Sequence, residues 1–182
     1  DKVAVMMGNS IETLEAIFGV VRAGGCVVPL SGLLTGEQLS GLLADCGAKA
    51  AIVSDAFADR VLPLRDDLGA ITEWISCGFD ASGWTAIEMV LASDATDAPD
   101  VRYELTDPFN IIYSSGTTGL PKGIVQTHRA RMHWAFSNAV EMGFDSRARA
   151  LVTTPLYSNG TWLMMLPVLF AGGTLHVMPS FD

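Results

Sequence analysis

The sequence lacks the features that mark membrane proteins and nucleic-acid-binding platforms. Its longest apolar run, residues 162–171, contains Pro167 and falls short of the roughly 18 residues that a membrane helix needs. No secretory signal peptide opens the chain. The 182 residues carry only 11 lysines and arginines against 20 acids, and this net charge of −9 excludes the basic face that nucleic acids require. We expect a soluble protein without a membrane segment and without a nucleic-acid partner.

Cysteine is scarce as well, and its spacing argues against two kinds of site. Cys26, Cys46 and Cys77 make an odd count, with no CxxC pair and no His/Cys spacing that suits a metal ion. The pattern therefore disfavours both a disulfide framework and a metal centre, and we assign no metal ligands. We expect buried free thiols in a reducing compartment, and hence a cytoplasmic protein.

Apolar residues are abundant, and charge is unevenly distributed. Hydrophobic residues make up 49% of the chain and charged residues 17%, which predicts a folded domain with a sizeable core. Residues 55–107 hold 12 acids and 3 bases, whereas the rest of the chain is balanced. Residues 108–182 carry 5 bases and 3 acids. A site for an anionic ligand is therefore expected in this last segment.

Short apolar runs alternate with helical periodicity in the first part of the chain. The runs that predict strands are 3–7, 26–30 and 50–53. Between them, apolar residues recur at helical spacing, and we expect Asn9 with Glu12, and Thr35 with Gln38, to cap two helices. Strands that are apolar on both faces and separated by helices form parallel sheets. The sequence thus predicts an α/β fold with parts of two mainly parallel sheets flanked by helices.

We divide the chain into a first α/β lobe over 1–54, an acidic irregular connection over 55–107 and a second lobe over 108–182. The connection is expected to hold one or two short strands and helices. In the second lobe we expect strands at 110–113, 123–126, 150–154 and 174–178, and helices between 127 and 143 and over 161–170. The first of these helices is expected to present one apolar face to the core, made of Met132, Ala135, Phe136, Ala139 and Val140.

Residues 114–123 (SSGTTGLPKG), between two predicted strands, carry the clearest chemical signal. Glycines let backbone N–H groups turn toward a ligand, hydroxyls add donors, and Lys122 adds a positive charge, so the segment suits phosphate oxygens. A flexible turn is the alternative. The segment is not a G-x-x-x-x-G-K-[ST] loop, because Pro121 replaces the second glycine and Gly123 follows the lysine.

Residues 111–122, read I-x-x-S-S-G-T-T-G-L-P-K, match at every position the signature of the adenylate-forming superfamily. This superfamily comprises acyl-CoA synthetases, aryl-CoA ligases, luciferases and the adenylation domains of peptide synthetases. Residues 1–52 also resemble an early block of the family, and residues 169–182 resemble its AGG-T … F-D block. The resemblance covers nearly the whole chain and is weak only over 55–107.

The resemblance implies a reaction in two steps. A carboxylate attacks the α-phosphate of ATP to give an acyl-adenylate and pyrophosphate, and the thiol of CoA then displaces AMP. A cradle of donors with a cation and Mg²⁺ is the device expected for the first step. By position, the resemblance assigns ATP binding to Ser114, Ser115, Gly116, Thr117, Thr118, Gly119 and Lys122. It assigns catalytic roles to Lys122, Thr117 and Thr118.

Two positions depart from the family pattern. The family's P-L-x-H segment reads P-L-Y-S here, so the role of the histidine is unfilled. The residues that we still expect to border the acid substrate are Tyr157, Ser158, Asn159 and Gly160. Core packing is an equal alternative for Tyr157 and Trp162. Ser180 stands where several members have a lysine near the path of CoA.

The remaining polar residues are not assigned to chemistry. We expect His128 to lie at the start of a helix rather than to act as a base. The arginines that we expect to be solvated surface charges are Arg129, Arg131, Arg147 and Arg149.

Family members also contain an acid that assists Mg²⁺, a ribose-binding aspartate and a mobile C-terminal domain with a catalytic lysine. These elements are not found in this sequence. The sequence also begins without Met. We expect a fragment of the large N-terminal domain of an acyl-CoA synthetase for a fatty or aromatic acid. Such a fragment is inactive alone and needs the C-terminal domain of the same chain. The alternatives are a non-catalytic nucleotide- or acyl-binding module and a peptide-synthetase adenylation domain. A homo-oligomer is left open.

Overall fold

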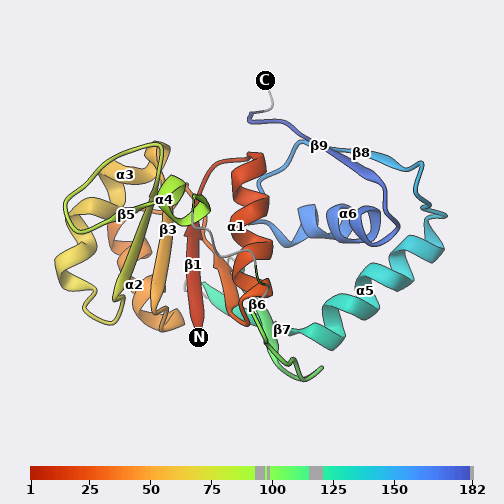
Figure 1. Ribbon diagram of the computed structural model, residues 1–182, viewed down its shortest axis with the longest axis horizontal. Coiled ribbons are helices and arrows are strands. Elements are labelled where there is room, and N and C mark those ends of the chain that lie inside the picture. Colours follow the sequence, from red (N-terminus) through yellow and green to blue (C-terminus); the bar gives the residue numbers. More distant parts are fainter. Residues whose placement is uncertain (93–96, 98, 115–120, 181–182) are drawn as a thin grey trace.

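The computed structural model describes residues 1–92, 97, 99–114 and 121–180. The strands are β1 (Lys2–Met6), β2 (Cys26–Pro29), β3 (Ala50–Ser54), β4 (Glu73–Cys77), β5 (Thr85–Ala86), β6 (Pro108–Ser114), β7 (Lys122–Thr127), β8 (Arg149–Val152) and β9 (Thr174–Val177). The helices are α1 (Ile11–Arg22), α2 (Gly36–Cys46), α3 (Asp55–Val61), α4 (Ile87–Leu91), α5 (His128–Glu141) and α6 (Asn159–Phe170), with a 3₁₀ helix at Leu62–Asp67. Figure 1 shows their arrangement along the chain.

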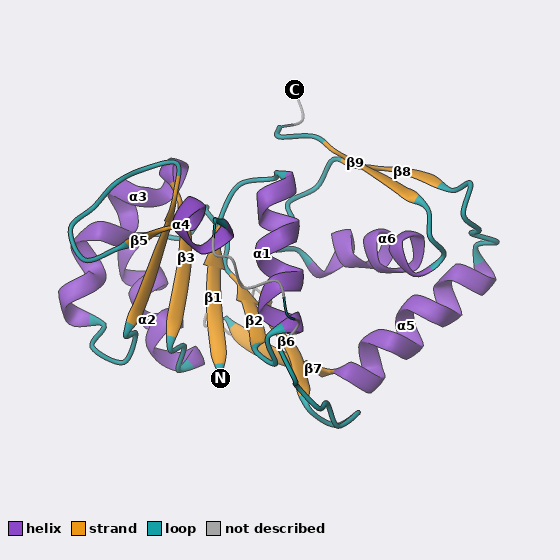
Figure 2. Cartoon of the chain, in the orientation of Figure 1, coloured by secondary structure: helices purple, strands orange, loops and turns teal. Residues whose placement is uncertain are grey.

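The described strands form one large and one small sheet. The large sheet has the order β5-β4-β3-β1-β2-β6-β7. Neighbouring strands in it pair in parallel, except that β6 and β7 pair antiparallel. The small sheet is the parallel pair of β8 and β9. Figure 2 shows the small sheet together with α5 and α6 on the far side of α1 from β1 and β3. The predicted α/β fold with parts of two mainly parallel sheets is confirmed.

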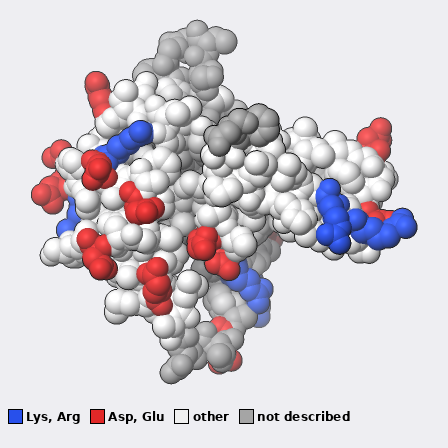
Figure 3. All heavy atoms as spheres, turned by 90° about the horizontal axis from the view of Figure 1, so that it is seen from above, with Lys and Arg blue, Asp and Glu red and all other residues white. Residues whose placement is uncertain are grey.

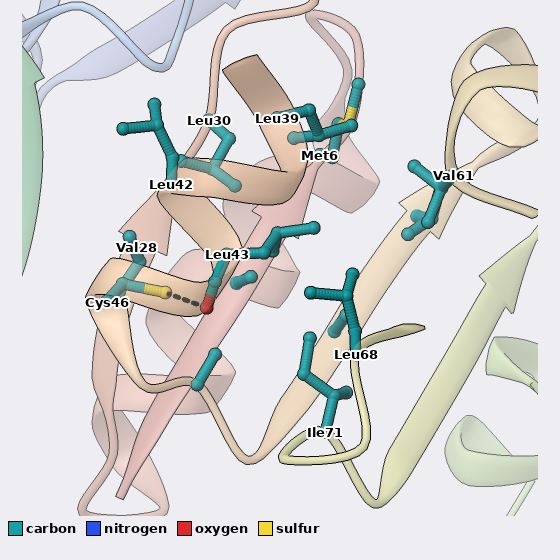
Figure 4. Packing of buried hydrophobic residues seen from close by; sticks show 14 of the residues in the cluster. Met6, Val28, Leu30, Leu39, Leu42, Leu43, Cys46, Val61, Leu68 and Ile71 are labelled. Atoms are coloured by element: carbon teal, nitrogen blue, oxygen red, sulfur yellow. Dashed lines mark hydrogen bonds between the residues drawn. The ribbon is translucent and has the colours of Figure 1, made fainter. Parts of the chain in front are cut away.

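Alternate residues of the central strands face opposite sides of the large sheet. In β1, Ala4 and Met6 belong to a buried cluster that α2 and α3 complete, whereas Val5 belongs to a second cluster with α1, α5 and α6. Figure 4 shows Leu39 of α2 next to Met6 in the first cluster. Because helices cover both faces of the sheet, the central strands must be apolar at every position, which explains their continuous apolar runs.

The two predicted helix caps have different outcomes. The capping box of α2 is confirmed, since the Thr35 hydroxyl accepts a hydrogen bond from the Gln38 backbone and the Gln38 side chain accepts one from the Thr35 backbone. The prediction that Asn9 caps α1 is wrong. Ser10 is the N-cap residue, and its hydroxyl accepts from the backbone N–H of Thr13. The Asn9 side chain is engaged elsewhere, as described below.

Residues 55–77, within the acidic connection, form short helices and one strand. α3 and the 3₁₀ helix follow β3, and β4 then pairs in parallel with β3 from Ala50–Glu73 to Ser54–Cys77. Short elements of this kind were expected within 55–107, but their positions were not predicted from the sequence. β4 lies near an edge of the sheet and buries only alternate residues, Trp74 and Ser76, so it does not read as an apolar run.

The buried face of α5 also differs from the prediction. Ala135 and Ala139 are buried as expected, but the exposed fractions are 52% for Met132, 54% for Phe136 and 65% for Val140. The third buried residue of this helix is Arg131, which lies one turn before Ala135. Residues at 131, 135 and 139 share one helix face because four positions make about one turn.

The cysteines are free thiols, as predicted: Cys26 and Cys46 are buried, and Cys77 is half-buried. Burial raises the pKa of Cys26 to about 11, so this thiol is protonated and unreactive at neutral pH.

None of the described helices has the length and apolar character that crossing a bilayer requires. On the face that Figure 3 shows, most acidic side chains lie on the side of the molecule that carries α2 and α3.

Candidate active site

The phosphate-loop candidate is held between β6 and β7. These strands pair antiparallel with Ser114 opposite Lys122, so the first and last polar residues of the segment are brought together. Ser114 is half-buried and Lys122 is exposed. The other predicted ATP ligands lie outside the described residues: Ser115, Gly116, Thr117, Thr118 and Gly119. The two ends of the loop are therefore located, and the roles of its interior residues stay a prediction.

A cavity of about 360 Å³ lies at the carboxyl ends of β2 and β6, which are neighbouring parallel strands. Pro29 lines it at the end of β2, and Tyr113 and Ser114 line it at the end of β6. Leu42 of α2 and Pro121 add apolar surface. Ligands of open α/β sheets bind outside the carboxyl ends of the strands. Ser114 thus lies where this rule places a ligand.

A second cavity, of about 340 Å³, shares Tyr113, Ser114 and Tyr157 with the first. Ser158, Asn159 and Gly160 line it from the start of α6. The four residues predicted to border the acid substrate therefore lie together beside the end of β6. Tyr157 lines both cavities, whereas Trp162 is 0% exposed and belongs to the second core cluster. Core packing is therefore the outcome for Trp162, whereas the role of Tyr157 beside the acid stays a prediction.

Asn9 holds the segment that leads from β8 into α6. Its Nδ2 donates to the carbonyl oxygens of Thr154 (3.0 Å) and Met178 (3.2 Å), and its Oδ1 accepts from the backbone N–H of Leu156 (2.9 Å). The loop after β1 thereby fixes a segment about 145 residues further along the chain. The sequence did not reveal this role, because the short spacing from Asn9 to Glu12 suggested a local cap.

The same segment is held from the side of α6. The Thr161 hydroxyl donates to the carbonyl oxygen of Pro155 and contacts the Thr154 hydroxyl, both at 2.7 Å. The indole Nε1 of Trp162 donates to the carbonyl oxygen of Leu156 at 2.7 Å. Buried donors with partners of this quality stabilise one conformation. The residues from Thr154 to Ser158 are therefore fixed from two sides.

Arg131 is buried, so the prediction that it is a solvated surface charge is wrong. It is 2% exposed, and burial lowers the pKa of its guanidinium to about 10, so it stays charged at neutral pH. Nε donates to Oδ1 of Asn110 at 2.8 Å, and Nη2 donates to Oδ1 of Asn159 at 2.9 Å. The four-residue spacing to the buried Ala135 and Ala139 is the sequence signal that could have identified it.

Tyr113 ties the end of β6 to α2. Its hydroxyl donates to Oδ2 of Asp45 at 2.5 Å. Burial, and then this hydrogen bond, raise the pKa of Tyr113 well above its usual range. The neutral phenol is the form that the folded protein favours, so the contribution of this group to stability is present below the unfolded pKa of about 10 and is lost as the pH rises through the folded value.

Titration of Tyr113 is expected to require a higher pH than that of an ordinary tyrosine. In the full-length protein, the difference in near-ultraviolet absorbance between wild type and Tyr113→Phe should show a tyrosinate signal only well above pH ~10. Asp45→Asn should lower this pKa only in part, because burial is the larger cause and remains. A difference signal centred near pH ~10 in wild type would contradict the hydrogen bond and the burial.

Two further expectations concern His128 and metal ions. His128 is the first residue of α5, as expected, and it packs between the rings of Tyr103 (4.8 Å between centroids) and Phe109 (5.1 Å). Burial lowers its pKa, and Asp107 partly opposes this shift.

No group of three or more His, Cys, Asp or Glu side chains within the described residues suits a metal ion.

Comparison with known proteins gives the chain its relatives. It is 32% identical to the long-chain-fatty-acid–CoA ligase FadD13 of Mycobacterium tuberculosis, over 100% of this chain and 35% of that protein. It is 33% identical to the indoleacetate–CoA ligase of Aromatoleum aromaticum, over 99% of this chain and 36% of that protein. The chain thus spans about a third of the length of these curated relatives.

A solved structure and a family model agree with this. The inhibitor-bound N-terminal domain of FACL13 from M. tuberculosis superimposes with a TM-score of 0.86 at 31% identity, covering 100% of this chain and 45% of that one. The model of the AMP-binding enzyme family matches residues 1–182. The structure agrees, because it places Ser114 and Lys122 at the ends of a loop between two strands, and Ser114 lines two cavities. These matches show that the chain belongs to the AMP-binding enzymes and corresponds to part of the N-terminal domain of their acyl-CoA ligases.

Proposed function

We propose that the full-length protein is an ATP-dependent acid–CoA ligase that activates a fatty or aromatic carboxylic acid as its acyl-adenylate. The observation that carries the proposal is the position of Ser114, which lines two cavities at once and begins the loop that Lys122 ends. An acid and a nucleotide must meet at one point for adenylation to occur. The shared wall of the two cavities, beside the end of β6, supplies such a point.

In this proposal the chain contributes positioning and charge. Ser114 and the loop residues Ser115, Gly116, Thr117, Thr118 and Gly119 donate to phosphate oxygens of ATP. The Lys122 ammonium offsets the negative charge that develops on the phosphoryl group, with Thr117 and Thr118 as donors. Tyr157, Ser158, Asn159 and Gly160 border the acid and hold its carboxylate toward the α-phosphate. Orientation of two reactants in this way accounts for much of the acceleration in such reactions.

Further parts of the proposal concern what lies beyond the described residues. We propose that Mg²⁺ enters with the phosphates of ATP and that CoA is the thiol acceptor. We also propose that a ribose-binding aspartate and a C-terminal domain with the catalytic lysine belong to other parts of the same protein. Residues 1–54, 55–107 and 108–182 are proposed as the sections of the partial N-terminal domain. We also propose a cytoplasmic location, because free cysteines are typical of a reducing compartment.

Pyrophosphate exchange by the full-length protein tests the proposal. Labelled pyrophosphate should enter ATP only when a suitable acid is present, in a panel of long-chain fatty, arylacetic and hydroxycinnamic acids. Release of AMP should then require CoA. Nucleotide binding without exchange for any acid would instead support a non-catalytic binding module. Transfer to a carrier protein rather than to CoA would support a peptide-synthetase adenylation domain.

A further inference from the structure

Arg131 is a buried cation among neutral groups. Its guanidinium lies 4.9 Å from the ring centroid of Trp134 and 4.7 Å from that of Trp162. Its hydrogen-bond acceptors are the side-chain oxygens of Asn110 and Asn159, and Nη1 is buried without a partner among the described residues. The salt bridge found in the described part of the chain joins Arg147 and Asp145 and does not involve Arg131. A buried charge without a counter-ion is unfavourable for stability, so a role beyond packing is indicated.

The guanidinium fixes the direction in which Asn159 presents its amide group. A guanidinium has N–H donors and no acceptor, so the oxygen of the Asn159 amide must face Arg131, at 2.9 Å from Nη2. The amide nitrogen of Asn159 then points away from Arg131. Asn159 is half-buried and lines the 340 Å³ cavity with Ser114 and Tyr157. Its two N–H donors are therefore the polar atoms that this side chain offers to a ligand.

Three contacts hold the guanidinium itself in place. The two indole faces restrict its plane through cation–π attraction, and Asn110 of β6 accepts from Nε. The donor that reaches Asn159 is thus fixed by the large sheet and by α6 together. A side chain that is locked in this way orients its neighbour at little entropic cost when the ligand arrives.

We propose that Arg131 is a positioning residue, which holds the amide of Asn159 so that Nδ2 donates to an oxygen atom of the carboxylic acid substrate. This inference rests on the proposed function, because that function places the acid in the cavity that Asn159 lines. Arg131 does not contact the acid. It acts through Asn159, and the loss of either partner therefore has the same consequence.

Steady-state pyrophosphate exchange by the full-length protein gives the first test. Arg131→Met keeps a long side chain between the indoles but removes the donors, and it should raise the KM for the acid by roughly tenfold while the KM for ATP stays the same. Arg131→Lys, which keeps the charge and a donor, should restore part of the loss. Arg129→Met, at an exposed position of the same helix, is the matched control and should behave as wild type. An unchanged KM for the acid in Arg131→Met would overturn the inference.

Variants of Asn159 separate positioning from packing. Asn159→Asp keeps an oxygen for Arg131 but loses the N–H donors, so it should raise the KM for the acid at least as much as Arg131→Met does. The double variant Arg131→Met with Asn159→Ala should be no worse than Asn159→Ala alone, because both changes remove one shared contact. Normal acid binding by Asn159→Asp, or a double variant whose loss is the product of the two single losses, would overturn the inference.

Backbone hydrogen exchange distinguishes failure of this inference from failure of the proposed function. Arg131→Met should accelerate exchange of the hydrogen-bonded amides of Ser158 and Thr161 by roughly tenfold and leave residues 36–46 of α2 unchanged. Unchanged exchange at these two amides overturns the inference whether or not the enzyme is active. Absence of pyrophosphate exchange with every acid overturns the proposed function, and with it the substrate contact of Asn159. If Arg131→Met also unfolds α2, Arg131→Lys and Asn159→Asp decide by the same two readouts.

Discussion

Replacement of Lys122 by alanine in the full-length protein is expected to slow pyrophosphate exchange by a factor of about 10²–10³, which is typical for loss of one preorganised group that stabilises transition-state charge. Lys122 begins β7, and its pairing with Ser114 fixes its backbone at the end of the candidate loop. Lys122 is an exposed residue, so the change should affect the rate and not the fold. The rate of exchange at saturating acid and ATP is the measurement.

Two further variants control for charge in general. Lys49→Ala removes an exposed lysine from the turn before β3, far along the large sheet from β7, and should leave the rate unchanged. Lys122→Arg keeps the charge but changes its shape, and should retain an intermediate rate. Equal exchange rates for Lys122→Ala and wild type would show that this ammonium does not act on the phosphates.

Replacement of Trp162 by alanine is expected to cost about 3–5 kcal/mol of stability in the region around α6. The indole is 0% exposed, its edge packs against the Phe109 ring at 6.1 Å between centroids, and its N–H bonds the carbonyl oxygen of Leu156. The change therefore opens a cavity, leaves that carbonyl oxygen without its donor, and removes one of the two rings that flank Arg131.

Hydrogen exchange in the full-length protein measures this loss locally. Amides of α6 and β6 should lose protection by roughly two to four orders of magnitude in Trp162→Ala. Trp134→Ala removes the other indole beside Arg131, but this side chain is only half-buried, so the loss should be smaller. Equal protection in Trp162→Ala and wild type would contradict the placement of this residue in the core.

The elements that were predicted well are those whose signal is local. β1, β2 and β3 are buried on both faces and read as continuous apolar runs, and the Thr35–Gln38 box depends on residues three positions apart. The position of β4 was not predicted, because a strand near the sheet edge buries only every second residue, among them the polar Ser76. The face of α5 was misjudged because apolar side chains were assumed to be buried, whereas Met132 and Phe136 are exposed.

In the candidate site, too, the residues with a local sequence signal were predicted, and those that act through long-range contacts were not. The segment that ends at Lys122 and the wall from Tyr157 to Gly160 were predicted from motif and resemblance, and the structure places Ser114 and this wall around one cavity. The side chains that hold residues 157–160 in place were not predicted. Asn9 and Arg131 act across 145 and 28 residues of sequence, respectively, and periodicity or capping patterns do not register contacts at such distances.

The three hydrogen bonds of Asn9 have a consequence for hybrid proteins assembled from members of this family. A crossover anywhere between residues 10 and 153 would take Asn9 from one parent and its acceptors, the carbonyl oxygens of Thr154 and Met178, from the other. Exchange of substrate preference by transplanting the segment around Tyr157 should therefore succeed more often when the loop after β1 is transplanted with it.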